Sequence, residues 1–172
     1  MPSPPASRDF PARLTSGWLL VLVIISLVAL TACERSAPDV VFSTLSGQKI
    51  PLQSLRGKIV LVNFWATSCA PCVHEMPQLA GIYRQLNARG LEIVAVAAVY
   101  DPPNAVLDFA TTRRLPFPVA LDLQDEVAQA FGGIKAVPTA YLVGRDGKII
   151  EHFEGELEAA DLRRLLEEAL AE

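Results

Sequence analysis

The chain of 172 residues contains few cysteines and few histidines: three cysteines and two histidines. Three cysteines cannot build the disulfide framework that holds small secreted domains together. A structural zinc site usually needs two cysteine pairs, or one pair and two histidines, and only His74 and His152 could complete one. We therefore expect neither a disulfide scaffold nor a bound metal.

Blocks of like charge are also missing. The 15 basic and 19 acidic residues are spread along the chain and give a net charge of −4. This argues against a nucleic-acid partner and against a polybasic patch for anionic membranes. No internal repeat or low-complexity tract is present. A hydrophobic fraction of 51% over this length fits one globular domain of roughly 100 to 150 residues plus an extra segment.

That extra segment lies at the N-terminus. Residues 17–33 read GWLLVLVIISLVALTAC without a charge, and Arg8 and Arg13 precede them. As a helix, this apolar run would span about 24 Å, less than the hydrocarbon core of about 30 Å, so a signal peptide fits better than a membrane-spanning helix. We expect the mature domain to work outside the cytoplasm, on the periplasmic side of a bacterial cell envelope.

The apolar run ends in Leu30-Thr31-Ala32-Cys33, which resembles the lipobox of bacterial lipoproteins. The resemblance implies that Cys33 is lipidated, becomes the mature N-terminus and anchors the protein to a membrane. The alternative is an uncleaved anchor that ends in an incidental cysteine. The polar, proline-bearing residues 34–39 (ERSAPD) predict a short tether, which leaves residues 40–172 as the domain.

Apolar stretches of strand length alternate with helical patterns along this domain. We expect a hairpin over 40–52, a central strand buried on both faces over 58–66, and a second hairpin over 139–155. Between and after them, the pattern predicts helices at 72–90, 103–115, 124–133 and 157–170, and strands at 91–99 and 117–122. This order predicts an α/β domain with a mixed central sheet flanked by helices.

The other two cysteines, Cys69 and Cys72, lie between the central strand and the first helix. A cysteine at a helix N-terminus faces unpaired backbone N–H groups and the positive end of the helix dipole, which lower its pKa. Two intervening residues place Cys72 one helical turn from Cys69, where it can resolve a mixed disulfide. Two buried structural cysteines are the simpler alternative. Crowding both at one junction of an exported chain favours redox chemistry instead.

The stretches VLVNFWATSCAPC and AVPTAYLVGRDGKI together resemble the thioredoxin fold, and specifically its membrane-tethered TlpA/ResA-like thiol-disulfide oxidoreductases. The resemblance covers roughly residues 40–170. It implies a thioredoxin-like fold with an added N-terminal hairpin and a central insertion. It also implies that Val137, Pro138 and Thr139 form a cis-proline loop that faces the cysteines and helps to bind an extended substrate.

Other positions follow or depart from the pattern of that family. Glu75 matches an acidic residue thought to tune or deprotonate the buried thiol, and its alternative is a solvated first-turn glutamate. Asn63 stands where thioredoxins proper carry a buried aspartate. Ser68 replaces the tryptophan usual before the first cysteine, so Trp65 is the remaining aromatic candidate for substrate contact, although it fits the core equally well.

The resemblance implies a protein-disulfide reductase with no cofactor beyond the redox-active disulfide of Cys69 and Cys72. Its partners would be exported thiol or disulfide proteins, such as apocytochrome c, and a membrane thiol electron donor. One alternative is a copper chaperone that uses both cysteines and His74, because thiolates select Cu(I). Another is a thiol peroxidase, but Val62 and Ala66 stand where peroxiredoxins need Pro and Thr.

Overall fold

The computed structural model describes residues 35–171. The predicted signal peptide and the lipidation site Cys33 lie outside these residues. Within the described part of the chain, no helix is long and apolar enough to cross a membrane.

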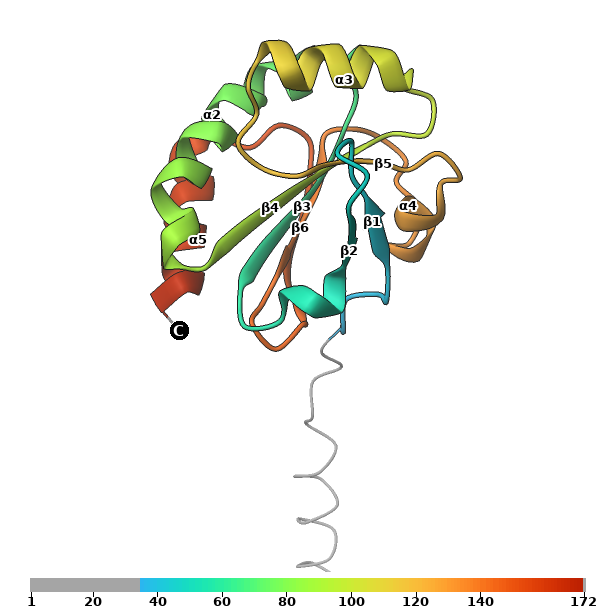
Figure 1. Cartoon of the computed structure of the whole chain (residues 1–172). Helices are drawn as coiled ribbons and strands as arrows, with labels where there is room; N and C mark the ends of the chain where they lie inside the picture. The colour runs from blue at the N-terminus through green and yellow to red at the C-terminus, as the bar shows by residue number, and fades with distance from the viewer. Residues whose placement is uncertain (1–34, 172) are drawn as a thin grey trace, which may run out of the picture. The chain divides into compact units, whose positions relative to one another are not determined.

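A five-stranded mixed sheet forms the centre of the domain (Figure 1). Its strands are ordered β5-β4-β3-β6-β7. The central strand β3 pairs in parallel with β4 and antiparallel with β6, while β5 joins β4 in parallel and β7 joins β6 antiparallel. A separate two-stranded hairpin is formed by β1 and β2. The strands are β1 (Val41–Ser43), β2 (Lys49–Pro51), β3 (Ile59–Trp65), β4 (Leu91–Ala97), β5 (Val119–Leu121), β6 (Thr139–Val143) and β7 (Ile149–Glu154).

Helices connect these strands in the order that the sequence predicts. They are α2 (Ala70–Leu86), α3 (Pro103–Thr112), α4 (Glu126–Ala130) and α5 (Ala159–Ala171), with short 3₁₀ turns η1 (Leu52–Leu55) and η2 (Asn87–Arg89). The element α4 is shorter than expected, a helix of five residues. Gly90 is the C-cap residue of η2, the turn that follows α2. Its φ of 104° is a left-handed conformation that glycine adopts at little cost.

The two central strands are buried on both faces. All seven residues of β3 and all seven of β4 are buried, which explains their nearly continuous apolar sequences. Since side chains alternate along a strand, each strand supplies two separate clusters. Ile59, Leu61 and Trp65 of β3 face one cluster, and Val60, Val62 and Phe64 face the other.

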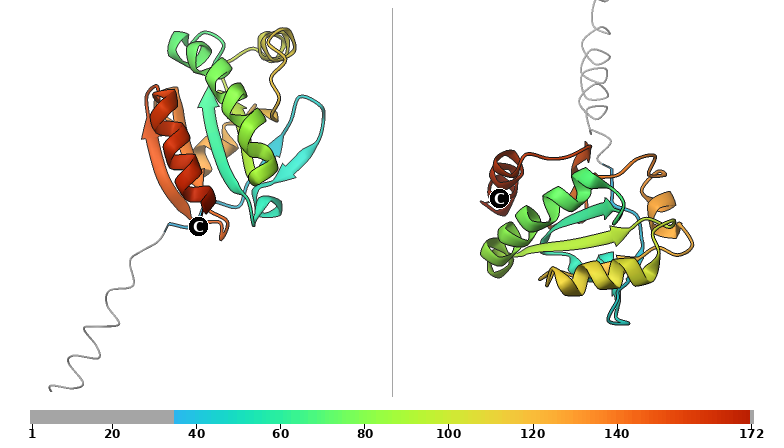
Figure 2. Two further views of the ribbon diagram at one scale, coloured as in Figure 1. Left: turned by 90° about the vertical axis from the view of Figure 1, so that its left-hand side faces the viewer. Right: turned by 90° about the horizontal axis from the view of Figure 1, so that it is seen from above.

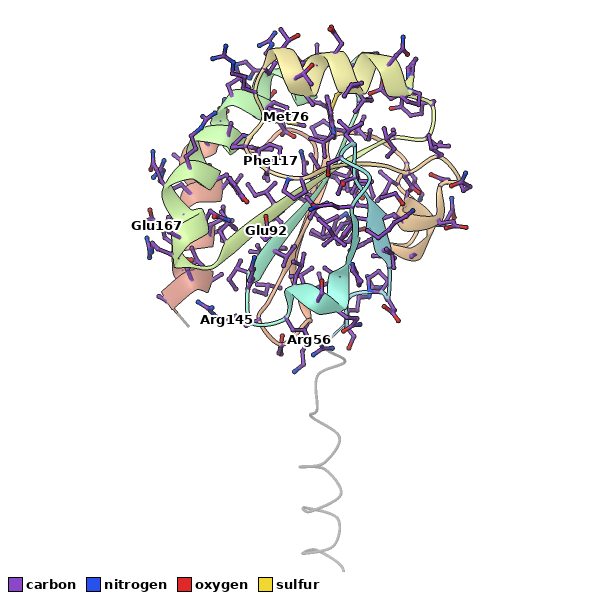
Figure 3. All side chains as sticks on the ribbon, viewed as in Figure 1. Arg56, Met76, Glu92, Phe117, Arg145 and Glu167 are labelled. Carbon is purple, nitrogen blue, oxygen red and sulfur yellow. A yellow bond between two sulfur atoms is a disulfide. The ribbon has the colours of Figure 1, made fainter. Side chains whose placement is uncertain are left out.

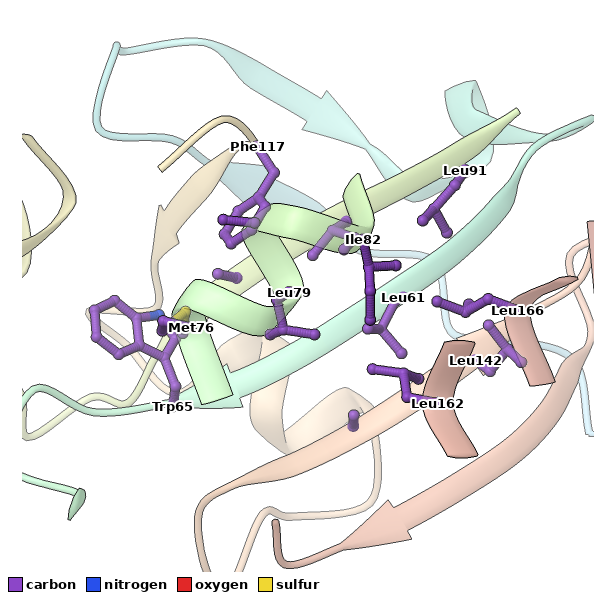
Figure 4. Packing of buried hydrophobic residues seen from close by; sticks show 14 of the residues in the cluster. Leu61, Trp65, Met76, Leu79, Ile82, Leu91, Phe117, Leu142, Leu162 and Leu166 are labelled. Atoms are coloured by element: carbon purple, nitrogen blue, oxygen red, sulfur yellow. The ribbon is translucent and has the colours of Figure 1, made fainter. Parts of the chain in front are cut away.

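The larger cluster lies between the sheet and helices α2, α3 and α5. Figure 2 shows α2 and α5 side by side over the same face of the sheet. In the close view of Figure 4, Met76 of α2 lies beside Trp65, while Leu162 and Leu166 of α5 lie near Leu142 of β6. This face carries the packing that positions the N-terminus of α2 against the sheet.

The smaller cluster lies on the opposite face, under the β1–β2 hairpin, η1 and α4. Phe42 of β1 is completely buried there, and Phe131 after α4 packs edge-on against Phe64 of β3 with 5.6 Å between ring centroids. The predicted N-terminal hairpin therefore seals a face of the sheet that would otherwise expose apolar side chains.

The predicted tether 34–39 is shorter than expected. The carbonyl of Arg35 accepts a hydrogen bond from the N–H of Ile149, and the N–H of Ala37 donates to the carbonyl of Gly147, both within 2.9 Å. Ser36 forms an isolated bridge with Lys148. These backbone bonds extend the β6–β7 hairpin, so residues 35–37 belong to the folded domain.

Arginine side chains fix the β6–β7 turn at the same end of the domain (Figure 3). Arg145 donates from Nη1 to the carbonyl of Gly57 and from Nη2 to that of Leu170, at 2.9 and 3.2 Å. Arg56 donates to the carbonyl of Asp146 at 2.6 Å. The turn is therefore tied both to the start of β3 and to the end of α5.

Candidate active site

The two cysteines lie where β3 passes into α2. Cys69 is the N-cap residue of α2, with extended backbone angles, and the backbone N–H of Cys72 donates to its Sγ at 3.2 Å. Sulfur thus replaces the side-chain oxygen that usually caps a helix. Pro71 occupies the first turn, where a missing N–H leaves no hydrogen bond unmade. The cap geometry favours negative charge on the Cys69 sulfur.

Cys69 and Cys72 are joined as a disulfide, with 5.2 Å between their Cα atoms. They differ in exposure, because Cys69 is partly exposed whereas Cys72 has no exposed surface. A partner can therefore reach the sulfur of Cys69 but not that of Cys72. This asymmetry agrees with the positions expected from the two-residue spacing.

The loop before β6 faces the disulfide. The carbonyl oxygen of Val137 lies 3.5 Å from the Sγ of Cys69, and the Val137–Pro138 peptide bond is cis, as predicted. Pro138 is buried, and its carbonyl accepts a hydrogen bond from the N–H of Gly155 at 2.8 Å. The fold thus brings together residues 69 and 137, which are 68 positions apart in the sequence.

Glu75 lies one helical turn after Cys72 and is buried, with 5% of its surface exposed. This excludes the alternative of a solvated first-turn glutamate. Its Oε1 accepts a hydrogen bond from Nδ2 of Asn63 in β3 at 3.0 Å. Burial is the main cause that raises the pKa of Glu75 to about 7; Glu156 adds to the rise, while Asn63 and the backbone of Leu157 oppose it.

Sequence reasoning missed the partnership of Asn63 with Glu75. The sequence places Asn63 at the position of the buried aspartate of thioredoxins but does not indicate its partner. A signal was present, because a polar side chain in the middle of a buried apolar strand requires a hydrogen-bond partner. Glu75, a buried polar residue of the facing helix α2, is the hydrogen-bond partner of Asn63.

His74, the expected copper ligand of the chaperone alternative, is bonded to another residue instead. Its Nδ1 is hydrogen-bonded to a carboxylate oxygen of Glu156, and the side chain is exposed. Glu156 raises the pKa of His74 through this hydrogen bond and its charge. Within residues 35–171, no three His, Cys, Asp or Glu side chains gather in a way that could hold a metal ion.

Asp101 is a second residue that sequence reasoning missed. It is buried, and its carboxylate accepts hydrogen bonds from both the backbone N–H and the hydroxyl of Thr67, at 2.6 and 2.5 Å. Thr67 lies two residues before Cys69. Asp101 therefore ties the loop after β4 to the loop that carries the exposed cysteine.

Two of the predicted substrate contacts need correction. Trp65 has no exposed surface, because it shares a face of β3 with Leu61 and packs against Phe109 with 5.0 Å between ring centroids. It is a core residue under the site and cannot touch a substrate in this conformation. Thr139 is also buried, and its hydroxyl donates to the carbonyl of Ala136 at 2.8 Å. That bond holds the proline loop in shape.

Comparison with known proteins agrees with this geometry. The AhpC/TSA family model matches residues 33–152. A thiol-disulfide oxidoreductase ResA from Geobacillus thermodenitrificans is 39% identical over 136 residues, which cover 79% of this chain and 77% of the relative. The ResA of Bacillus thuringiensis subsp. konkukian is 38% identical over 132 residues, covering 77% and 75%. The chain belongs to the ResA thiol-disulfide oxidoreductases.

Solved structures show the same fold. A thiol:disulfide interchange protein of the thioredoxin family from Chlorobium tepidum superposes with a TM-score of 0.75 at 29% identity, covering 81% of this chain and 98% of that one. StoA from Bacillus subtilis superposes with a TM-score of 0.65 at 26% identity, covering 74% and 96%. The predicted thioredoxin-like fold is confirmed, and the protein is a thiol-disulfide oxidoreductase. As a family member it carries its redox pair at the junction of β3 and α2.

Proposed function

We propose that this oxidoreductase reduces disulfides in exported proteins, with apocytochrome c as one substrate. In this proposal the domain works on the periplasmic side of a bacterial cell envelope and is held to the membrane by a lipid on Cys33. The observation that carries the proposed direction of attack is the difference in exposure between Cys69 and Cys72. Only the exposed sulfur, which also caps α2, can meet a disulfide on another protein.

The reaction proceeds through two exchanges. The Cys69 thiolate attacks one sulfur of the substrate disulfide, forms a mixed disulfide and releases the other substrate sulfur as a thiolate. The Cys72 thiolate then attacks the Sγ of Cys69, which closes the internal disulfide and releases the second substrate thiol. Two electrons pass from the protein to the substrate, and the two substrate sulfurs end as thiols.

Cys72 requires a proton acceptor for the second exchange, because a buried thiol has a raised pKa. Glu75 is one turn away on the same side of α2, since residues three apart on a helix are neighbours. With a pKa of about 7 it can accept a proton near neutral pH and give it up again. We assign it the role of proton acceptor for Cys72.

The oxidised protein must be reduced again before it can act a second time. The space outside the cytoplasm is oxidising, so electrons must come from a specific source. A thiol electron donor in the membrane fits this need, and the lipid on Cys33 would keep the domain beside it. Thiol exchange with this donor reverses the two steps above.

Two single variants of the full-length protein test the order of attack. Cys72→Ser keeps the attacking thiol and removes the resolving one, so it should accumulate mixed disulfides with periplasmic proteins. Cys69→Ser removes the exposed thiol and should accumulate almost none. Non-reducing gels of cells expressing each variant, followed by mass spectrometry of the trapped partners, give the result. Equal trapping by both variants would refute the assignment, and the absence of exported cysteine proteins among the partners would refute the substrate class.

A further inference from the structure

A hollow of about 260 Å³ lies between helices α2 and α3, apart from the residues that surround the disulfide. Its floor is apolar. Met76 and Ala80 of α2 are buried there, and Phe109 of α3 and Leu115, in the loop after α3, are partly buried beside them. A partner that places an apolar side chain on this floor removes apolar surface from water, which stabilises the complex.

Two arginines stand at the edge of this floor, one from each helix. The guanidinium of Arg113 lies over the ring of Phe109, 5.3 Å from its centroid, a cation–π contact that holds the side chain in place. Nη2 of Arg84 donates to the carbonyl oxygen of Arg114 at 3.5 Å. A guanidinium has five N–H donors, so both arginines keep donors that match the two oxygens of a carboxylate.

No carboxylate of the domain neutralises these charges. Among residues 35–171, Arg84, Arg113 and Arg114 form no ion pair. Arg84 lies in the last turn of α2 and Arg113 is the C-cap residue of α3, where the negative ends of the helix dipoles stabilise positive charge. A positive edge is thus maintained on a chain whose net charge is −4, and it is complementary to an acidic partner.

The position of the hollow favours a protein over a membrane as that partner. The backbone of residues 35–37 is bonded to the β6–β7 turn, and Figure 1 shows this turn and α3 at opposite ends of the domain. Cys33 is two residues from Arg35 in the sequence. A lipid on Cys33 would therefore hold the membrane at the end of the domain away from the hollow.

We propose that this hollow is a docking site for an acidic segment of a partner protein. One large apolar side chain of the segment fills the hollow, which exceeds the volume of about 150 Å³ that holds a benzene molecule, and Asp or Glu residues beside it pair with Arg84 and Arg113. Met76 lies seven residues after Cys69, about 10 Å along α2. A partner docked here can therefore also present a cysteine to Cys69, at a raised effective concentration.

Cysteine-free peptides test the docking site on the oxidised full-length protein. Calorimetric titration compares the peptides EELFEE, EEGGEE, QQLFQQ and KKLFKK. We expect EELFEE to bind about tenfold more tightly than EEGGEE, which lacks the apolar pair, and than QQLFQQ, which lacks the charges. KKLFKK should bind most weakly. Raising NaCl from about 0.1 M to about 1 M should weaken the binding of EELFEE, because the screening length falls from about 10 Å to about 3 Å.

Variants of the two arginines locate the binding. Arg84→Gln and Arg113→Gln should each weaken the binding of EELFEE about threefold. Arg89→Gln is the matched control, because Arg89 is exposed on η2 and does not line the hollow, and it should bind EELFEE as the wild type does. A protein with both Arg84→Glu and Arg113→Glu should prefer KKLFKK to EELFEE. These side chains are exposed, so loss of the fold is not expected.

Three results would overturn the proposal. The first is that EELFEE binds no more tightly than EEGGEE and QQLFQQ, and the second is that Arg84→Gln and Arg113→Gln bind it like the wild type. The third is that no peptide binds, whereas vesicles of phosphatidylglycerol bind the wild type and not the protein with both Gln substitutions; the occupant would then be a membrane. None of these results affects the proposed function, because the peptides carry no cysteine and disulfide exchange is tested separately by trapping with Cys72→Ser.

Discussion

The side-chain amide of Asn63 donates a hydrogen bond of 3.0 Å to Oε1 of Glu75, and this bond joins the central strand to the helix that begins at the redox pair. Both residues are buried. The bond favours the charged form of Glu75, but burial outweighs it, and the pKa of Glu75 is raised to about 7. A carboxyl group that titrates near neutral pH therefore lies one helical turn from Cys72.

Glu75→Gln should change the pH dependence of the second exchange. Glutamine keeps the shape and can bond to Asn63, but it cannot accept a proton from Cys72. For the wild type, the rate at which Cys72 resolves a preformed mixed disulfide should rise with pH through about 7, as Glu75 loses its proton. In Glu75→Gln that rise should vanish, and the rate at pH 7.5 should fall by about 10²-fold. Stopped-flow measurement of product release from the mixed disulfide gives the profile.

The first exchange is the internal control for that experiment. Attack by Cys69 on a small disulfide does not use Cys72, so its pH profile should be similar in the wild type and in Glu75→Gln. A loss of rate in Glu75→Gln that is confined to the first exchange would contradict the role of Glu75. So would an unchanged inflection near pH 7 in the variant's pH profile for the second exchange.

The same substitution should alter stability in a pH-dependent way. An ordinary glutamate has a pKa of 4.5, whereas the pKa of Glu75 in the folded protein is about 7. Between these values the folded state binds more protons than the unfolded one, so the contribution of Glu75 to stability is full below about pH 4.5 and is lost as pH rises through about 7. Relative to the wild type, Glu75→Gln should therefore gain stability from pH 4 to pH 8, by up to about 3 kcal/mol.

Urea unfolding of both oxidised proteins at pH 4, 6 and 8 measures this gain. Glu126→Gln provides a matched control, since Glu126 is exposed on α4, and its stability difference from the wild type should stay nearly constant across the range. A constant difference for Glu75→Gln as well would show that Glu75 has an ordinary pKa in the folded protein.

Local patterns were enough to predict most of the fold. The run from Ile59 to Trp65 is apolar on both faces, and a buried central strand follows from that alone. Gly90 and Pro71 mark the ends of the helix between them through their backbone preferences. The cysteine pair could therefore be placed where the strand passes into the helix, since β3 ends at Trp65 and α2 begins at Ala70.

Contacts between distant parts of the chain could not be predicted in this way. The side of β3 on which Trp65 lies depends on strand register, and a one-residue shift would place it in the buried cluster on the opposite face. The approach of Val137 to Cys69 and the hydrogen bonds that Thr67 donates to Asp101 join residues 68 and 34 positions apart. The periodicities of helices and strands do not extend over such intervals. The approach of Val137 to Cys69 was therefore predicted only from the family resemblance, and the contact of Asp101 with Thr67 was not predicted.

Asp101 should be needed both for stability and for the rate of the first exchange. Asp101→Ala removes the acceptor of two hydrogen bonds and leaves the N–H and hydroxyl of Thr67 without it, which should cost about 1–3 kcal/mol in urea unfolding. Asp101→Asn keeps one acceptor oxygen and should recover part of this loss. Because the loop that carries Cys69 is then less well fixed, kcat/KM for disulfide reduction should fall in both variants.

Asp108→Ala is the control for this pair, since Asp108 lies exposed on α3, and it should change stability by less than about 0.5 kcal/mol. Asp101→Ala with wild-type stability and wild-type kcat/KM would show that the link between the two loops is not needed.

The lipid anchor at Cys33 gives the last prediction. The uncharged run up to Leu30-Thr31-Ala32-Cys33 fits a segment that is cleaved before a lipidated cysteine. Mass spectrometry of the protein from the membrane fraction should therefore find Cys33 as the N-terminal residue, with acyl chains attached. Cys33→Ser removes the acceptor sulfur, so the protein should keep the segment 1–33 uncleaved, while its redox pair still reduces disulfides because neither Cys69 nor Cys72 has changed. An intact segment 1–33 on the wild-type protein would instead establish an uncleaved anchor, in which Cys33 has no part.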